Sequence, residues 1–141
     1  MEHYENFKEE LQIRTAHAEE IIRRYLPEEA GFARTMAEAM NYSMCAGGKR
    51  PRPIPSSGNI PDVWPRMSVL QSLYGRIEMI HTHSLIHDDL PAIDNDDFRR
   101  GRLTTHKVYG EAMGVLSGVS LLNYAYETML GAFDLTSDKA E

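Results

Sequence analysis

Residues 108–133 read VYGEAMGVLSGVSLLNYAYETMLGAF, and no other stretch of the chain is as informative about its fold class. The apolar residues recur at alternating steps of four and three, a spacing that places side chains on one face of an α-helix. We therefore expect one long helix over residues 107–133, buried along this stripe. The stripe consists of Val108, Ala112, Val115, Val119, Leu122, Tyr126, Met129 and Phe133.

Three earlier segments also have helical spacing. A helix over 3–26 would stop at Pro27, and one over 30–46 would be capped by Gly47-Gly48. A third is expected over 69–90. No segment alternates with period two for long, so the sequence predicts an all-α fold in one domain. The inward-facing residues of the third helix are predicted to be Leu70, Leu73, Ile77, Ile80 and Ile86.

Composition narrows the function classes. The chain has 15 Lys and Arg residues and 21 acidic residues, which gives a net charge of −6. This charge argues against nucleic-acid binding, because nucleic-acid binding depends on neutralising phosphates. The chain has no run of the roughly 20 apolar residues that a membrane helix needs, so we expect no membrane insertion. The acidic N-terminus lacks a signal peptide, and Cys45 is the only cysteine. Both features favour the reducing cytoplasm.

A dense acidic cluster follows the third predicted helix. Carboxylates this close repel one another unless a cation lies between them, and hard divalent cations prefer oxygen ligands. A solvated acidic turn is the simpler interpretation of such a run. Arginines at 99, 100 and 102 make a different interpretation attractive, since guanidinium groups and metal-bound carboxylates could hold a diphosphate from two sides. The aspartates are Asp88, Asp89, Asp94, Asp96 and Asp97.

The spacing of Asp88 and Asp94 does not suit a regular helix. Six residues correspond to about 600° of rotation, which leaves the two side chains about 120° off a common face. Pro91 lies between them, so the helix must bulge or break there, and a break could bring both carboxylates to one metal group. His81 precedes Asp88 by seven residues and is expected near the same face.

A second charged constellation, GGKRPRP, occupies residues 47–53. Lys49 and Arg52 at a helix–loop junction could bind another phosphate-bearing ligand. Taken alone, the loop is better explained as a capped helix end whose cations complement the helix dipole.

Together these motifs resemble a known family. Residues 84–101, SLIHDDLPAIDNDDFRRG, resemble the first aspartate-rich motif of the bacterial farnesyl/geranylgeranyl diphosphate synthases. These are trans-isoprenyl diphosphate synthases of the polyprenyl synthetase family. Residues 47–53 resemble the family's basic motif, and residues 105–112, THKVYGEA, continue the similarity. The resemblance covers about 1–53 and 77–135 and implies the N-terminal part of an isoprenoid-synthase helical bundle.

The resemblance implies a prenyltransferase that condenses isopentenyl diphosphate with an allylic diphosphate in isoprenoid biosynthesis. Asp88 and Asp94 would bind Mg²⁺ with support from Asp89, and Arg99 would contact the allylic diphosphate. Family members form homodimers through helices, so part of the long stripe is expected to face a second subunit. Four residues would hold isopentenyl diphosphate: Lys49, Arg52, His81 and Arg100.

Several features depart from the family pattern. The second aspartate-rich motif is absent, so we expect residues 1–141 to be an incomplete domain that is inactive alone. Val119 replaces a usual aspartate, and Ser84 and His83 stand where an aromatic residue often limits product length. Residues 54–76 are anomalous, because five prolines fall within 51–65, where the family has a helix.

A compensated frameshift is one hypothesis for the anomalous stretch. Shifting the reading by one base across 55–64 and 72–77 permits helix-like residues while conserving the total length. That would also explain the preserved interval between Lys49 and His81.

Two other functions stay open on the sequence. The aspartate motif also suits a terpene cyclase, although such an enzyme needs no isopentenyl diphosphate site. The missing second motif favours an inactive or regulatory fragment that still binds diphosphate.

Overall fold

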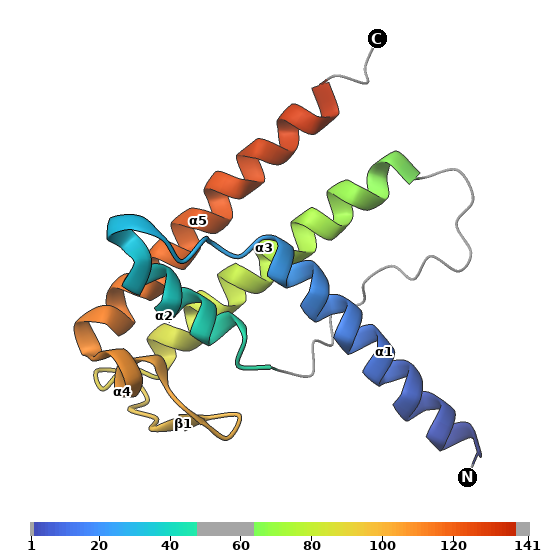
Figure 1. Ribbon diagram of the computed structural model, residues 1–141. Coiled ribbons are helices and arrows are strands. Elements are labelled where there is room, and N and C mark those ends of the chain that lie inside the picture. The colour runs from blue at the N-terminus through green and yellow to red at the C-terminus, as the bar shows by residue number, and fades with distance from the viewer. Residues whose placement is uncertain (1, 48–63, 138–141) are drawn as a thin grey trace.

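The chain folds as an arrangement of helices with one small β-hairpin, and this confirms the all-α prediction (Figure 1). The computed structural model describes residues 2–47 and 64–137. The elements are α1 (Glu2–Arg24), the 3-10 helix η1 (Gly31–Ala33), α2 (Arg34–Met44), α3 (Trp64–Asp88), β1 (Phe98–Arg99), β2 (Arg102–Leu103), α4 (Thr105–Tyr109) and α5 (Glu111–Ser137).

The first two helices lie close to their predicted positions. Helix α1 ends at Arg24, two residues before the predicted end and shortly ahead of Pro27. Helix α2 begins at Arg34 rather than at residue 30, because a 3-10 turn occupies Gly31–Ala33. Gly47, predicted as part of the cap, has a φ of +74°, a backbone conformation that costs glycine little.

Helix α3 begins at Trp64, five residues before the predicted start. Its second residue is Pro65, which the first turn of a helix tolerates because the N–H there has no intrahelical partner. The rest of the proline-rich stretch, residues 51–63, lies outside the described residues. Ile86 is buried as predicted, but the prediction for Ile77 was wrong, since that side chain is 45% exposed.

The long helix predicted over 107–133 is two helices. Gly110 separates α4 from α5 with a φ of +89°, outside the right-handed helical region. Glu111 then opens α5, where a carboxylate favours the positive end of the helix dipole. The change of direction matters for the site, because it turns α4 back toward the aspartate-rich segment.

The face by which α5 packs is not the predicted apolar stripe. Val115 is 41% exposed, and Val119 and Tyr126 are exposed as well, whereas Leu121 is 0% exposed. Small residues explain the difference, because they allow α3 to approach the α5 backbone closely. At Gly118 a methyl group would overlap the ring of His87 on α3. The buried face consists of Gly114, Ser117, Gly118, Leu121 and Ala125.

The apolar core lies where α1 and α2 pack against the α3–α5 pair. Helices α3 and α5 run side by side in opposite directions, with α2 across one end of the pair (Figure 1). The aspartate-rich segment, the hairpin and α4 gather at this same end. No helix in the described part of the chain is both long and apolar enough to span a bilayer. Core residues come from four helices: Ala18, Ile21, Ile22, Met40, Met44, Tyr74, Met79, Ile86, Leu121 and Ala125.

Candidate diphosphate and metal site

The aspartate-rich segment forms a closed loop at the end of α3. The Leu90 carbonyl accepts hydrogen bonds from the N–H groups of Ile93 at 2.9 Å and of Asn95 at 3.0 Å. The N–H of Asp94 donates to the carbonyl of Asp88 at 2.9 Å. The helix therefore breaks near Pro91, as the sequence suggested, and the chain returns to set residue 94 beside residue 88.

The carboxylates of Asp88 and Asp94 are available to a ligand. Asp88 is half-buried and Asp94 is exposed. Neither carboxylate has a hydrogen bond or an ion pair within the described residues. Mg²⁺ is typically bound by one or two carboxylates together with substrate phosphates and water, so this pair fits it. Over residues 2–47 and 64–137 no three His, Cys, Asp or Glu side chains form a ready cation cage.

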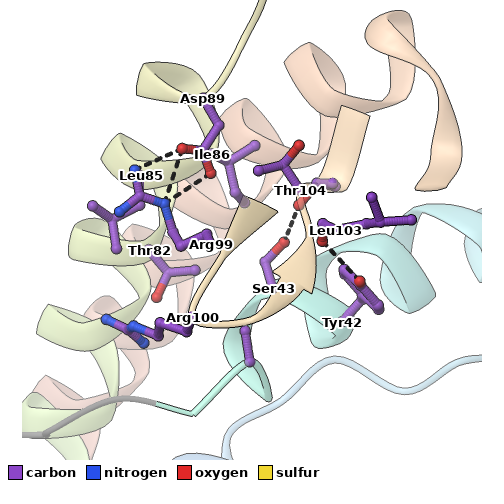
Figure 2. Close-up of a pocket in the computed structure, with 12 residues that line it drawn as sticks. Tyr42, Ser43, Thr82, Leu85, Ile86, Asp89, Arg99, Arg100, Leu103 and Thr104 are labelled. Carbon is purple, nitrogen blue, oxygen red and sulfur yellow. Dashed lines mark hydrogen bonds and ion pairs between the residues drawn. The ribbon is translucent and has the colours of Figure 1, made fainter. Parts of the chain in front are cut away.

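Asp89 points to Arg99 rather than toward the other two aspartates. Its Oδ2 accepts from Arg99 Nε at 2.8 Å, and its Oδ1 accepts from Arg99 Nη2 at 2.6 Å (Figure 2). Asp89 is only 4% exposed. These hydrogen bonds raise the pKa of Arg99 despite its partial burial. Asp89 thus orients the arginine that was predicted to contact the allylic diphosphate.

The Asp89–Arg99 pair leads to a prediction about stability. Replacing Arg99 with alanine leaves a buried carboxylate uncompensated, so we expect a loss of about 2 kcal/mol in the free energy of unfolding. Adding Asp89→Asn to that variant should recover part of the loss, because the amide carries no charge. Urea denaturation of the three proteins measures both effects.

The matched control for this prediction is Arg24→Ala, which removes an arginine from an exposed pair with Glu20. Such surface pairs contribute little to stability, because water screens both charges. Equal losses in Arg99→Ala and Arg24→Ala would contradict the structural role of the buried pair.

The β-hairpin joins the aspartate segment to the end of α2. Arg100 donates through Nη1 to the carbonyl of Gly47, and Arg102 donates through Nη1 to that of Cys45 at 3.1 Å. The Arg102 guanidinium also lies 4.2 Å from the centre of the Tyr42 ring. The sequence analysis grouped Arg102 with Arg99 and Arg100 as a possible diphosphate ligand, and in the structure it contacts the end of α2 instead.

Three more residues were predicted to bind isopentenyl diphosphate, and the structure describes only His81 among them. His81 is half-buried on α3, and its carbonyl accepts from Ser84 Oγ at 2.8 Å. Lys49 and Arg52 lie outside the described residues. The helix end that precedes them, however, is the end of α2 that Arg100 and Arg102 contact.

Two further histidines attach α3 to α5. His83 Nδ1 lies 3.0 Å from the Gly118 carbonyl, and His87 Nε2 lies 3.1 Å from the Val115 carbonyl. Their rings pack edge to face with centres 4.5 Å apart. Both contacting nitrogens must carry protons, because a carbonyl only accepts. His83 therefore donates to the α5 backbone, a contact that sequence spacing could not reveal.

A pocket lies between α2, α3 and the hairpin (Figure 2). The Asp89–Arg99 pair closes one side of it, and Arg100 lies on another. Hydroxyl groups of Ser43 and Thr105, which both line the pocket, lie 2.5 Å apart and join α2 to α4. The pocket is lined by Tyr42, Ser43, Ala46, Thr82, Leu85, Ile86, Asp89, Arg99, Arg100, Leu103, Thr104 and Thr105.

Known proteins resemble the chain in both sequence and structure. It is 48% identical over 109 residues to a farnesyl diphosphate synthase of Geobacillus stearothermophilus. This alignment covers 77% of this chain and 36% of the relative. It is 50% identical over 95 residues to the large subunit 1 of a heterodimeric geranylgeranyl pyrophosphate synthase of Arabidopsis thaliana, which covers 67% of this chain and 26% of the relative. The chain thus spans about a third of these relatives or less.

Solved structures support the same relationship. A geranyltranstransferase of Thermotoga maritima superposes with a TM-score of 0.73 at 37% sequence identity, over 88% of this chain and 46% of that one. The family model described as polyprenyl synthetase matches residues 33–139, which include both aspartates of the candidate metal site and the hairpin arginines. The chain belongs to the polyprenyl synthetase family.

Proposed function

We propose that these residues supply one diphosphate-binding wall of a magnesium-dependent prenyltransferase that condenses isopentenyl diphosphate with an allylic diphosphate. The observation that carries the proposal is the closed loop that sets Asp94 beside Asp88, with Arg99 held by Asp89 on the same segment. Family membership and the names of the relatives agree with this chemistry.

The proposed reaction begins when the C–O bond of the allylic diphosphate breaks and its electron pair leaves with the diphosphate. The isopentenyl double bond then attacks the allylic carbon, and loss of a proton restores a double bond. Magnesium, when bound, would neutralise charge on the departing diphosphate. Asp88 and Asp94 would hold it. Arg99 would stabilise the departing oxygens, with its guanidinium oriented in advance by Asp89.

For the second substrate we propose Lys49, Arg52, His81 and Arg100 as ligands of isopentenyl diphosphate. The contact from Arg100 to the end of α2 supports this, because it ties the hairpin to the helix that leads into the basic loop.

We also propose a homodimer and a cytoplasmic location. An apolar face of α5 is exposed in the single chain and suits a subunit contact. Leu130 is 68% exposed on it, so Leu130→Glu should shift the protein toward monomer in sedimentation analysis. The other exposed members of this face of α5 are Val115, Leu116, Val119 and Tyr126.

The proposed cytoplasmic location agrees with Cys45, which is a free thiol and fits a reducing compartment.

Calorimetric titration of the purified protein with dimethylallyl diphosphate and with isopentenyl diphosphate tests the proposed function. We expect the allylic ligand to bind with Mg²⁺ and to lose affinity in a chelator, and isopentenyl diphosphate to bind at its own site. Binding of the allylic ligand alone would favour a terpene cyclase. Binding of both ligands without turnover in any assembly would favour a regulatory protein, and binding of neither would overturn the proposal.

A further inference from the structure

The aspartate loop needs a support that its own carboxylates cannot provide. Asp94, Asp96 and Asp97 are exposed within four residues, and like charges so close repel one another. Backbone hydrogen bonds fix the first half of the loop at Leu90. The second half is held by the segment that follows the hairpin.

Thr104 makes the central contacts with this second half. Its Oγ1 donates to the Asp96 carbonyl at 2.8 Å, and its N–H donates to the Asp97 carbonyl at 3.0 Å. Thr104 is only 3% exposed. Its own carbonyl accepts from the N–H of Lys107 at 3.0 Å, so the first turn of α4 fixes the threonine in turn.

His106 contacts the Thr104 hydroxyl from the buried side. Its Nδ1 lies 3.1 Å from Thr104 Oγ1. The threonine hydroxyl has one proton, and the nearer Asp96 carbonyl can only accept it. His106 must therefore carry its proton on Nδ1 and donate to the threonine. That assignment leaves Nε2 as an acceptor, and this buried atom has no hydrogen-bond partner within the described residues.

The packing of α5 holds His106 in this orientation. Gly114 is buried against the His106 side chain and Leu90, and a methyl group at this glycine would lie 3.0 Å from each. An ion pair of 2.7 Å between Lys107 and Asp97 adds to the same link, although both side chains are largely exposed and solvent weakens it. The aspartate loop is thus connected through buried contacts to the backbone of α5.

We propose that Thr104 and His106 are positioning residues, which hold the aspartate loop in the geometry that binds a metal–diphosphate complex. The inference rests on the proposed function and extends it to residues that touch neither metal nor substrate. Partners that orient metal ligands from outside typically change affinity by about 10- to 100-fold when removed.

The first test compares Thr104→Val with Thr104→Ser in calorimetric titrations with Mg²⁺ and inorganic diphosphate. Valine matches threonine in shape but lacks the hydroxyl, so we expect affinity to fall about tenfold. Serine retains the hydroxyl and should stay within about twofold of the wild type, which serves as the rescue. Unchanged affinity in folded Thr104→Val would overturn the positioning role.

A second pair of variants keeps the inference testable if Thr104→Val does not fold. The amide nitrogen of asparagine can occupy the place of Nδ1, whereas that of glutamine reaches the place of Nε2. His106→Asn should therefore preserve diphosphate affinity better than His106→Gln. Equal affinity in the two variants would contradict the inference.

Nitrogen NMR of the wild-type protein supplies a readout that does not depend on function. We expect the proton of neutral His106 on Nδ1, and a proton on Nε2 would overturn the link to Thr104. If wild-type protein fails to bind diphosphate with Mg²⁺, the proposed function fails and takes this inference with it. If wild type binds diphosphate and the Thr104 and His106 variants bind it with the same affinity, the inference alone fails.

Discussion

Replacing Asp88 with asparagine is expected to weaken magnesium-dependent binding of inorganic diphosphate by about 100-fold, equivalent to about 2.7 kcal/mol. The amide keeps the shape of the side chain but removes the charge that attracts a hard cation. The structure gives this carboxylate no hydrogen bond or ion pair with any described residue, so its loss should hardly change the free energy of unfolding. Titration in Mg²⁺ and in chelator, with urea denaturation alongside, measures both quantities.

Asp96→Asn is the matched control for this experiment. It removes the same charge from the same loop, at an exposed residue that the resemblance does not assign to the metal. We expect affinity for the metal–diphosphate complex to fall only a few-fold, because a carboxylate that does not bind the metal attracts it only from a distance and through solvent screening. Equal affinities in Asp88→Asn and wild type would remove Asp88 from the metal site, and equal losses in the two variants would show that only net charge matters.

The second large effect concerns the core. Leu121→Ala should lower the free energy of unfolding by about 2–5 kcal/mol, because it deletes a fully buried side chain between α5 and its neighbours and leaves a cavity. Urea denaturation at low protein concentration, where subunit contacts contribute least, measures the loss.

The adjacent residue, Leu122, provides a control of identical chemistry on the same helix. It was predicted to lie at the centre of the buried stripe, but it is only partly buried in the structure. We expect Leu122→Ala to cost about 1 kcal/mol, in proportion to the smaller area it removes from water. A larger loss from Leu122→Ala than from Leu121→Ala would mean that the structure places the wrong face of α5 inward.

Within the single chain, α5 packs by a different face from the predicted stripe, and the difference has a clear physical cause. Apolar spacing identifies a helix and an apolar face, but it cannot say what that face contacts. Here large apolar residues such as Val115 remain exposed, while Gly118 lies against the His87 ring of α3. Close approach of two helices depends on the shape of both surfaces. Glycine has no side chain, so an analysis of hydrophobic spacing does not register it as a packing position.

The extent of the first three helices could be predicted from the sequence, because helix geometry depends on residues that are close together in the chain. Prolines, glycines and repeated apolar residues act over one or two turns, so α1, α2 and α3 were predicted to within about five residues. The break at Gly110 was missed because a single glycine within an apolar run is compatible with a continuous helix. Its φ of +89° is a property of the folded backbone.

The chemistry proposed for the site also follows largely from the linear sequence. The clustered aspartates indicate a divalent cation, the neighbouring arginines indicate phosphate, and their order indicates the family, because side-chain type alone dictates which ligands are possible. Tertiary structure decided how these groups are paired: Asp89 binds Arg99, Asp94 returns to Asp88, and the loop is held through Thr104. Such pairings depend on where the backbone turns and which atoms then come within 3 Å. Pro91 predicted the return of residue 94 toward residue 88. The other two pairings have no signal in the spacing, because they depend on how the folded backbone turns.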